Sequence, residues 1–191
     1  IEYRWAEGRN ERFAEFAGEF VRLKVDVILT DGGATLAAKK VTSTIPIVFA
    51  VAADPLGGGY VASLARPGGN VTGSSVQASD TAGKRLGLLR EALPELRSVA
   101  VLVNPNYPAA LIETRELEAA AEKLGIDIVR AEIRKPAEIA PAINAVKDRA
   151  EALYVCTDSF ANSNRGAINA AAFAASLPTM HGFRDAARAG G

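Results

Sequence analysis

The stretch Leu64–Gln77, LARPGGNVTGSSVQ, decides how this chain folds, because it separates two halves that follow the same order of strands and helices. In the first half, the apolar run Val25–Leu29 ends in the polar and flexible sequence Thr30-Asp31-Gly32-Gly33. A short helical pattern follows, and a new strand opens at Ile45-Pro46. This is the pattern of a strand–helix–strand unit of a parallel sheet.

The second half repeats this pattern. The apolar run Ala152–Cys156 ends in Thr157-Asp158-Ser159, a helical pattern follows, and the next strand opens at Leu177-Pro178. Duplicated α/β units joined by a Gly-rich crossing predict two lobes with a ligand cleft between them. The expected bounds are 1–77 for the N-terminal lobe, 78–191 for the C-terminal lobe and 71–77 for a hinge crossing.

Composition limits the classes of partner. The chain has 191 residues, of which 49% are hydrophobic and 23% are charged, so it lies in the ordinary globular range. The 22 Lys and Arg residues are matched by 22 Asp and Glu residues, so no net field favours a nucleic acid or an anionic membrane. No apolar run approaches the roughly 20 residues that span a bilayer. A small neutral or zwitterionic partner suits this balance.

Strands alternate with helices through short connections, which predicts doubly wound parallel sheets with helices on both faces. Phe13, Phe16, Ala17 and Phe20 recur at helical spacing behind Asn10, an expected N-cap, and Asp80 is an expected cap of a later helix. Strands are expected at 1–5, 25–30, 45–51, 70–76, 98–103, 126–133, 152–156 and 179–183. The other expected helices include 34–42, 60–64, one closed by Gly125, one opened by Pro136, 162–176 and 184–189.

Candidate site residues follow from this topology, because ligands of open parallel sheets bind beyond the carboxyl ends of the strands. In the first lobe the candidates are Thr30, Asp31, Gly32, Gly33, Ala34, Thr35, Asp54, Ser74 and Ser75. In the second lobe they are Asn104, Asn106, Tyr107, Thr157, Asp158, Ser159, Phe160, His181 and Phe183.

Each kind of candidate has a chemical role and a plainer alternative. Backbone N–H groups at Gly32-Gly33 can approach a carboxylate at a helix N-terminus, and Asp31 or Asp158 can pair with an ammonium group. An aromatic side chain at Tyr107, Phe160 or Phe183 can stack on an apolar ligand. Alternatively, both aspartates only cap helices, and Asn104-Pro105-Asn106 is only a turn.

Residues for catalysis or metal binding are scarce. His181 is the single histidine and Cys156 the single cysteine, so the usual ligand set of a metal site is lacking. The sequence contains neither the Gly-x-Ser-x-Gly elbow of a hydrolase nor the Lys-Ser/Thr ending of a phosphate loop. Cys156 is interpreted as a buried packing residue and His181 as a structural or cleft-lining one. The chain is therefore predicted to bind a solute without a cofactor or metal.

Several runs together resemble the ABC transporter substrate-binding family. They are Arg66-Pro67-Gly68-Gly69-Asn70-Val71-Thr72-Gly73 following Asp54-Pro55, Glu2–Gly8, Ile45–Phe49, Lys84-Arg85-Leu86, Val101–Asn106 and Leu177-Pro178. The resemblance covers essentially the whole chain, and the run after Asp-Pro is its most specific part.

This resemblance implies a type I periplasmic-binding-protein fold, whose two lobes close on a small solute and hand it to a membrane permease. Assigned members resemble binders of tryptophan, tyrosine or other amino acids and are periplasmic or lipid-anchored at the cell surface. By similarity, the candidate loops named above line the cleft, and no nucleic acid is involved.

The resemblance also implies that the N-terminal lobe is incomplete, because the family has a strand and helix ahead of Ile1 and further strands after Gly191. The strands expected at 1–5 and 25–30 then have unpaired edges, through which the chain could form oligomers. Two alternatives stay open. One is an enzyme such as a racemase that uses Cys156 or His181 as acid or base, and the other is the effector-binding domain of a transcription regulator.

Overall fold

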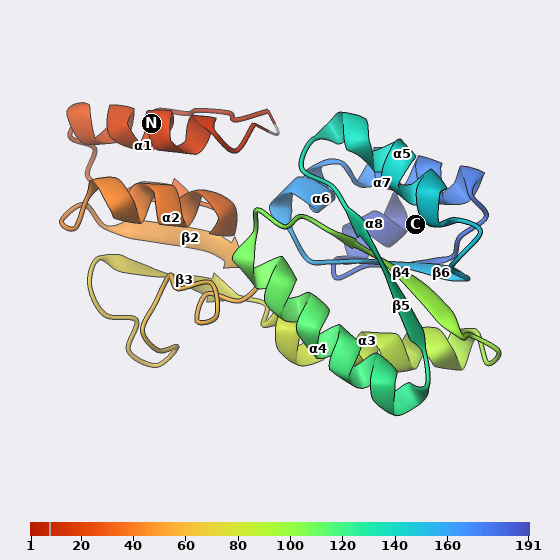
Figure 1. Cartoon of the computed structure of the whole chain (residues 1–191). Helices are drawn as coiled ribbons and strands as arrows, with labels where there is room; N and C mark the ends of the chain where they lie inside the picture. Colours follow the sequence, from red (N-terminus) through yellow and green to blue (C-terminus); the bar gives the residue numbers. More distant parts are fainter. Residues whose placement is uncertain (8) are drawn as a thin grey trace. The chain divides into compact units, whose positions relative to one another are not determined.

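The chain forms two compact α/β units. The structure is a computed structural model that describes residues 1–7 and 9–191, and its backbone contacts divide it into Ile1–Gln77 (unit 1) and Ala78–Gly191 (unit 2). Figure 1 shows the helices and strands of each unit. Both sheets are entirely parallel, as the alternation of strands and helices predicted.

Unit 1 is built on a three-stranded sheet with the order β1-β2-β3. In its register Ile28 lies beside Ile47, which lies beside Val71. Helix α2 packs on the sheet and α1 packs on α2, so both lie on the same side of the sheet (Figure 1). The two described helices of unit 1 thus cover one face of its sheet, in the lobe that the sequence predicted to be incomplete. Its elements are α1 (Arg12–Arg22), β1 (Ile28–Thr30), α2 (Gly32–Val41), β2 (Ile47–Ala52) and β3 (Val71–Ser75).

The strand predicted at residues 1–5 is wrong. These residues have no regular secondary structure, and Tyr3 and Trp5 are 65% and 74% exposed. Their rings stack on each other at 6.4 Å, while the Arg4 Nε donates to a Glu19 carboxylate oxygen on α1 at 2.9 Å. Alternation of apolar and polar residues forms a strand only where a neighbouring strand accepts its hydrogen bonds, and the segment attaches instead through side chains.

Three further predictions in unit 1 need correction. The helix predicted at 60–64 is a run of bends, in which the Lys39 ammonium donates to the carbonyls of Gly59 and Tyr60 at 2.9 and 3.1 Å. Helix α1 begins at Arg12 without a side-chain cap, so Asn10 is not its N-cap. Strand β1 begins at Ile28 rather than at residue 25.

Unit 2 is built on a four-stranded sheet with the order β5-β4-β6-β7. Helices α3 and α4 pack together on one face, and α5 and α7 pack on the other (Figure 1). This is the doubly wound arrangement that the sequence predicted. The strands are β4 (Ser98–Val103), β5 (Asp127–Glu132), β6 (Ala152–Val155) and β7 (Thr179–Met180), and the helices are α3 (Ala78–Ala92), α4 (Pro108–Leu124), η1 (Pro136–Glu138), α5 (Ile139–Val146), α6 (Ser159–Ser163), α7 (Arg165–Ala174) and α8 (Arg184–Arg188).

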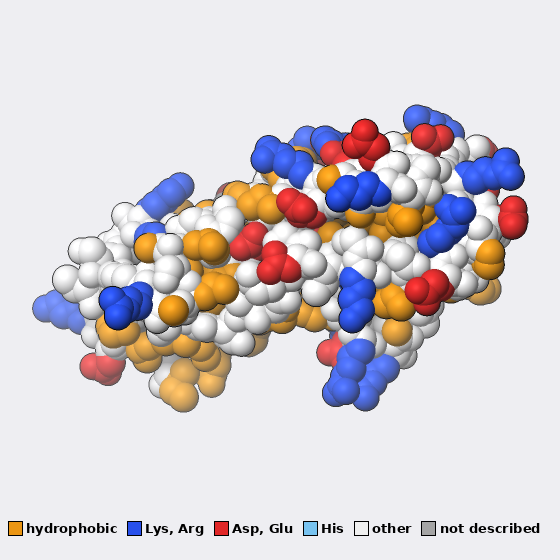
Figure 2. Space-filling view, turned by 90° about the horizontal axis from the view of Figure 1, so that it is seen from below, with side chains coloured by type: hydrophobic (Ala, Val, Ile, Leu, Met, Phe, Trp, Pro, Cys, Tyr) orange, Lys and Arg blue, Asp and Glu red, His pale blue; other side chains and the backbone are white. Residues whose placement is uncertain are grey.

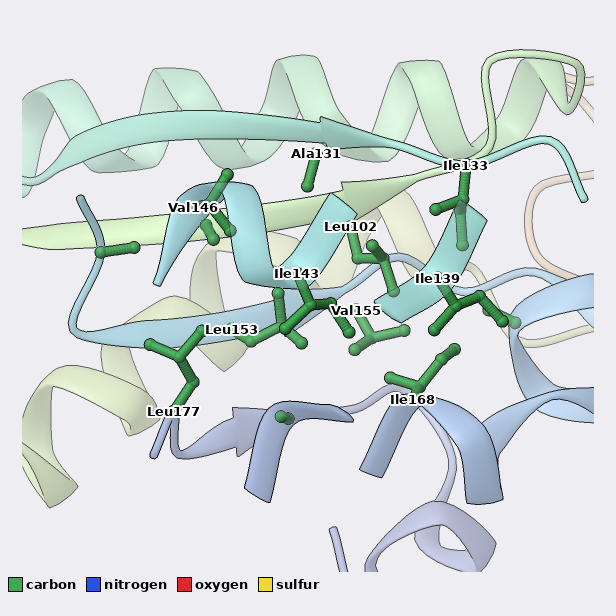
Figure 3. Packing of buried hydrophobic residues seen from close by; sticks show 14 of the residues in the cluster. Leu102, Ala131, Ile133, Ile139, Ile143, Val146, Leu153, Val155, Ile168 and Leu177 are labelled. Carbon is green, nitrogen blue, oxygen red and sulfur yellow. The ribbon is translucent and has the colours of Figure 1, made fainter. Parts of the chain in front are cut away.

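One apolar core cluster of unit 2 lies between the sheet and the α5/α7 layer. Leu102 of β4 and Val155 of β6 point toward Ile143 of α5 and Ile168 of α7, and all four are almost completely buried (Figure 3). Each such side chain contributes about 1.5–3 kcal/mol through removal from water. Five consecutive residues of β4, from Val99 to Val103, are buried, as expected of a central parallel strand covered on both faces.

The ends of the helices and strands in unit 2 confirm some of the predicted boundaries and correct others. Gly125 terminates α4 in the left-handed conformation at φ 65°, as predicted. Asp80 lies in the first turn of α3, not at its N-cap, because the helix already begins at Ala78. The helix predicted at 162–176 divides at Asn164, whose φ of −102° and ψ of 13° separate α6 from α7. The strand predicted at 179–183 comprises only Thr179–Met180.

The surface shows no preference for one sign of charge on the face drawn in Figure 2, where Lys and Arg side chains are intermixed with Asp and Glu. This agrees with the balanced composition. Of the helices in the described part of the chain, none has the length and apolar character needed to cross a membrane.

Candidate functional site

Polar side chains gather at the carboxyl ends of three neighbouring strands in unit 2. Asn104 follows β4, Thr157 and Asp158 follow β6, and His181 follows β7. Asn104, Thr157 and Asp158 are 2%, 4% and 5% exposed, so they are buried although they are polar. Buried polar groups require hydrogen-bond partners, and the bonds they form determine the shape of this edge.

Two hydrogen bonds help to fix Asp158. Its Oδ2 accepts from the Asn104 amide at 2.9 Å and its Oδ1 accepts from the Phe160 N–H at 3.0 Å, so it caps α6 and joins the ends of β4 and β6. The Asn104 Oδ1 in turn accepts from the Asn106 N–H at 3.0 Å. The cap interpretation of Asp158 and the turn interpretation of Asn104–Asn106 are therefore both confirmed, and neither prevents a role in binding.

A buried ion pair lies directly behind this edge. The Glu113 carboxylate on α4 is completely buried, and it accepts from the Arg85 guanidinium of α3 at 2.8 Å. It also accepts from the Tyr154 hydroxyl at 2.9 Å and from the Thr157 N–H at 2.9 Å. The Arg85 guanidinium lies over the Tyr154 ring, 5.1 Å from its centre. The Thr157 backbone is thus held by a charged acceptor, which forms a stronger bond than a neutral one.

Burial also determines the protonation of two groups here. Desolvation and the Glu113 carboxylate raise the pKa of Tyr154, so the phenol stays protonated and donates its hydrogen bond. Burial likewise raises the pKa of the Cys156 thiol, whose sulfur lies 3.4 Å from the Thr114 hydroxyl. Cys156 is 2% exposed, which confirms its interpretation as a packing residue. A protonated buried thiol is a poor base or nucleophile.

A small hollow opens between the ends of β6 and β7. Its volume is about 10 Å³, and its lining is Val155, Cys156, Thr157, Asp158, Ala161, Asn162, His181, Gly182, Phe183 and Ala186. Burial lowers the pKa of His181, so its imidazole is neutral at pH 7. A space of this size accommodates about one water molecule, whereas small-molecule pockets hold about 300–1,000 Å³. The hollow alone cannot enclose an amino acid.

In unit 1, the candidate residues also lie at strand ends, and their described bonds are local. Asp31 caps α2, with its Oδ1 accepting from the Ala34 N–H at 3.4 Å, so its cap interpretation is also confirmed. The Thr35 hydroxyl donates to the Asp31 carbonyl at 2.8 Å, and the Thr30 hydroxyl donates to the same carbonyl at 3.0 Å. Gly32 and Gly33 form the first turn of α2.

The remaining candidates of unit 1 follow β2 and end β3. Asp54 is 7% exposed, and its Oδ1 accepts from the Gly57 N–H at 2.8 Å. The Ser75 hydroxyl donates to the Gln77 side-chain oxygen at 2.6 Å, and Ser74 precedes it on the exposed part of β3. Each unit therefore has one edge of polar strand ends.

The aromatic candidates of unit 2 are not equivalent. Phe160 belongs to the apolar core cluster and is 5% exposed, while Tyr107 is the N-cap residue of α4 and is 6% exposed. Phe183 contributes to the lining of the small hollow and is only partly buried. Phe183 is therefore the more accessible aromatic ring at this edge.

Sequence reasoning missed Arg85, Glu113 and Tyr154. A signal was present, because Glu113 occupies the apolar stripe of α4 formed by Ala109, Leu117 and Ala121 at four-residue spacing, and all of these are buried. A charged residue in the middle of an apolar stripe indicates a buried ion pair or a functional group.

Two α/β units with parallel sheets and polar strand ends define the class of type I periplasmic-binding proteins, and comparison with known proteins agrees. The family model for "ABC transporter substrate binding protein" matches residues 1–191. The chain belongs to this family, which is a class of transporter solute-binding proteins and not of enzymes.

Individual relatives are similar over nearly all of the chain. A tyrosine-binding protein of Clostridioides difficile (strain R20291) is 28% identical over 94% of the chain. The crystal structure of a conserved domain protein from Vibrio cholerae O1 biovar El Tor has a TM-score of 0.92, with 29% identity over 99% of the chain. An ABC domain from Streptococcus pneumoniae in complex with L-Trp has a TM-score of 0.87, with 22% identity over 96% of the chain, and this likeness shows the fold.

The chain is shorter than these relatives. It spans 52% of the length of the tyrosine-binding protein, 64% of the Vibrio structure and 63% of the Streptococcus structure.

Proposed function

We propose that the chain is the solute-binding part of an ABC importer and that it binds an amino acid with an aromatic or other apolar side chain. The observation that carries this proposal is the buried Asp158 carboxylate, which Asn104 and the Phe160 N–H hold at the strand ends of unit 2. Relatives named for tyrosine or complexed with L-Trp support the same class of solute. The solute would be delivered to a membrane permease, with the protein in the periplasm or lipid-anchored outside the membrane.

The chemistry of a zwitterionic amino acid fits the two edges. A carboxylate can accept several hydrogen bonds at once, so Asp158 can bind an α-ammonium group while it keeps its present partners. The first turn of α2 at Gly32-Gly33 offers backbone N–H groups and the positive end of a helix dipole to the α-carboxylate. Phe183 and the neutral His181 provide surface for an aromatic side chain.

Binding in this proposal takes place between the two units, with the crossing at residues 71–77 as a hinge. Closure follows if the solute has a higher affinity for the closed form, since a ligand shifts a conformational equilibrium only by its differential affinity. The remaining contacts are assigned to Thr30, Asp31, Thr35, Asp54, Ser74, Ser75, Asn106, Tyr107, Thr157 and Ser159.

The test is a calorimetric titration of the protein with L-tyrosine, L-tryptophan, L-leucine and benzoate. Asp158→Asn keeps a good helix cap but removes the charge that pairs with the ammonium group, so we expect the affinity for the bound amino acid to fall about 10- to 100-fold. Asp127→Asn, at the exposed amino end of β5, is the matched control and should bind as the wild type does.

Two outcomes would reject the proposal. One is that the wild-type protein binds none of these amino acids, and the other is that Asp158→Asn binds with unchanged affinity. If benzoate binds more tightly than the amino acids, the solute is instead a carboxylate that lacks an ammonium group. Chiral chromatography of the incubated L-amino acid checks the racemase alternative, and we expect no D-isomer because the Cys156 thiol is buried and protonated.

A further inference from the structure

Arg85 connects three parts of unit 2 through one guanidinium group. Its Nη2 donates to the Glu113 carboxylate and to the Ala78 carbonyl, both at 2.8 Å, and its Nη1 donates to the Thr157 hydroxyl at 3.1 Å. The side chain is only 11% exposed. Ala78 is the first residue of unit 2, directly after the crossing, and Thr157 is the second residue after β6. One buried cation thus joins the start of the unit to the strand end that precedes Asp158.

The end of β7 is packed against the same group. A Cβ atom on Gly182 would overlap the Thr157 hydroxyl and would lie 2.8 Å from the Arg85 Nη1, so a side chain there would force Thr157, Arg85 or the end of β7 to shift. Gly182 follows His181, which lines the small hollow. The backbone after β6 is therefore held by Glu113, and the backbone at Gly182 lies close against the Thr157 side chain and the Arg85 guanidinium.

Net stabilisation does not explain such a pair well. The cost of removing two charges from water largely offsets their attraction, and well-packed apolar replacements are often as stable as a buried ion pair. A buried charge network does fix geometry, because each lone pair and each N–H group has a direction that only one arrangement satisfies. The pair lies behind the strand ends of β6 and β7, where a fixed geometry matters for binding.

We propose that the Arg85–Glu113 ion pair is a positioning device that holds the Thr157–Asp158 and His181–Gly182 strand ends in the geometry that binds the solute. The inference rests on the proposed function for its effect on affinity. Its effect on the strand ends themselves is independent of any solute. Arg85 and Glu113 act through Thr157 and Gly182 and do not contact the solute.

The test uses Arg85→Lys, which keeps the charge but replaces the planar five-donor group by a single ammonium that cannot keep all three partners in the same geometry. Two quantities are measured: amide hydrogen exchange by mass spectrometry, and affinity for L-tyrosine and L-tryptophan. We expect faster exchange at residues 157–160 and 181–183, unchanged protection of Ser98–Val103, and about tenfold weaker binding. Arg130→Lys is the matched control, because Arg130 forms an exposed two-bond pair with Glu118 on the same helix α4.

A second variant keeps both charges. Gly182→Ala disturbs the contact between the end of β7, Thr157 and Arg85 whichever of them shifts, so it should reproduce the faster local exchange and the weaker binding. Gly166→Ala, where a Cβ meets no atom within 4 Å, is its control. This pair of variants decides the matter if Arg85→Lys does not fold.

The outcomes separate the two proposals. Unchanged exchange at both strand ends in Arg85→Lys or Gly182→Ala, or an equal loss of protection along Ser98–Val103, would overturn the positioning role. Faster local exchange with unchanged affinity would overturn it as well. If the wild-type protein binds neither amino acid, the proposed function fails, and the exchange measurement still decides whether the pair positions the strand ends.

Discussion

The two units follow the same order of strands and helices but differ in how their polar strand ends are held. In unit 2, the bonds join residues far apart in the sequence, such as Asn104 to Asp158 and Thr157 to Glu113. In unit 1, the described bonds of Asp31 and Thr35 connect residues within four positions of each other. The geometry of the unit 2 edge therefore depends on the tertiary fold, while local turns set the geometry at this part of the unit 1 edge.

The central strand of unit 2 is also more completely packed than the edge strand of unit 1. Strand β4 has a partner on each side and helices on both faces, whereas β1 is an edge strand of three residues in which Leu29 is 70% exposed. Segments with few buried apolar contacts open more readily than core strands do. The comparison predicts that unit 2 holds its site rigidly and that unit 1 is the more adaptable partner.

The largest expected difference between the units comes from truncating one leucine in each sheet. Leu102→Ala removes a side chain that is 1% exposed from the unit 2 core (Figure 3) and should lower the free energy of unfolding of that unit by about 2–5 kcal/mol. Leu29→Ala on β1 should change the stability of unit 1 by no more than about 0.5 kcal/mol. Urea denaturation monitored by hydrogen exchange measures the free energy of unfolding of each unit separately.

Similar losses from the two substitutions would contradict the comparison. A large effect of Leu29→Ala in particular would mean that Leu29 is covered in solution by another chain. The hypothesis that oligomers form through this edge would then gain support, and sedimentation of the wild-type protein at several concentrations would examine it directly.

A smaller effect is expected at Gly73 on β3, in the crossing. A Cβ atom there would overlap the Phe49 carbonyl and ring on β2, and a backbone carbonyl cannot move aside as a flexible side chain can. Gly73→Ala should therefore destabilise unit 1 by about 1–3 kcal/mol. Gly87→Ala in α3 has no neighbour within 4 Å and should stabilise unit 2 by up to about 1 kcal/mol through helix propensity. Thermal unfolding by circular dichroism measures both, and equal shifts would refute the overlap argument.

Strand identity was predictable wherever burial is two-sided. Ser98–Val103 has the predicted bounds because its apolar run has no competing interpretation. Strand β3 also lies within the predicted 70–76, although most of its residues are exposed. Residues 1–5 alternate as a strand should, yet pairing is a tertiary property that the alternation alone does not contain. The break at Asn164 was likewise not visible, because Ala-rich sequence continues the helical pattern on its far side.

The gathering of polar side chains at the strand ends was predictable, whereas the charged groups behind them were not. The rule that ligands bind beyond the strand ends made Asn104, Thr157 and Asp158 candidates, and the structure places them together because parallel strands align their carboxyl ends. Arg85 and Glu113 lie on helices, where a charged residue is ordinarily exposed, so the sequence pattern hides their pairing unless their place in the apolar stripe is noticed.

The smallest effect is expected at the opposite end of the unit 2 sheet, where Glu151 accepts from the backbone N–H groups of Arg97 and Ser98 at 2.6 and 3.1 Å. These bonds hold the pKa of Glu151 below its usual value, so the stabilisation is present above about pH 4.5 and is lost as the pH falls through the lowered pKa. Glu151→Gln should therefore have a lower Tm than the wild type at pH 7, and the two values should converge once the pH has fallen below the lowered pKa of Glu151. Because Glu151 is exposed, the difference should also shrink in high salt. A constant difference in Tm across this pH range would mean that the charge of the Glu151 carboxylate does not strengthen its bonds to the start of β4. The Glu113 carboxylate would then be the stronger candidate for a charge-dependent contact in this unit.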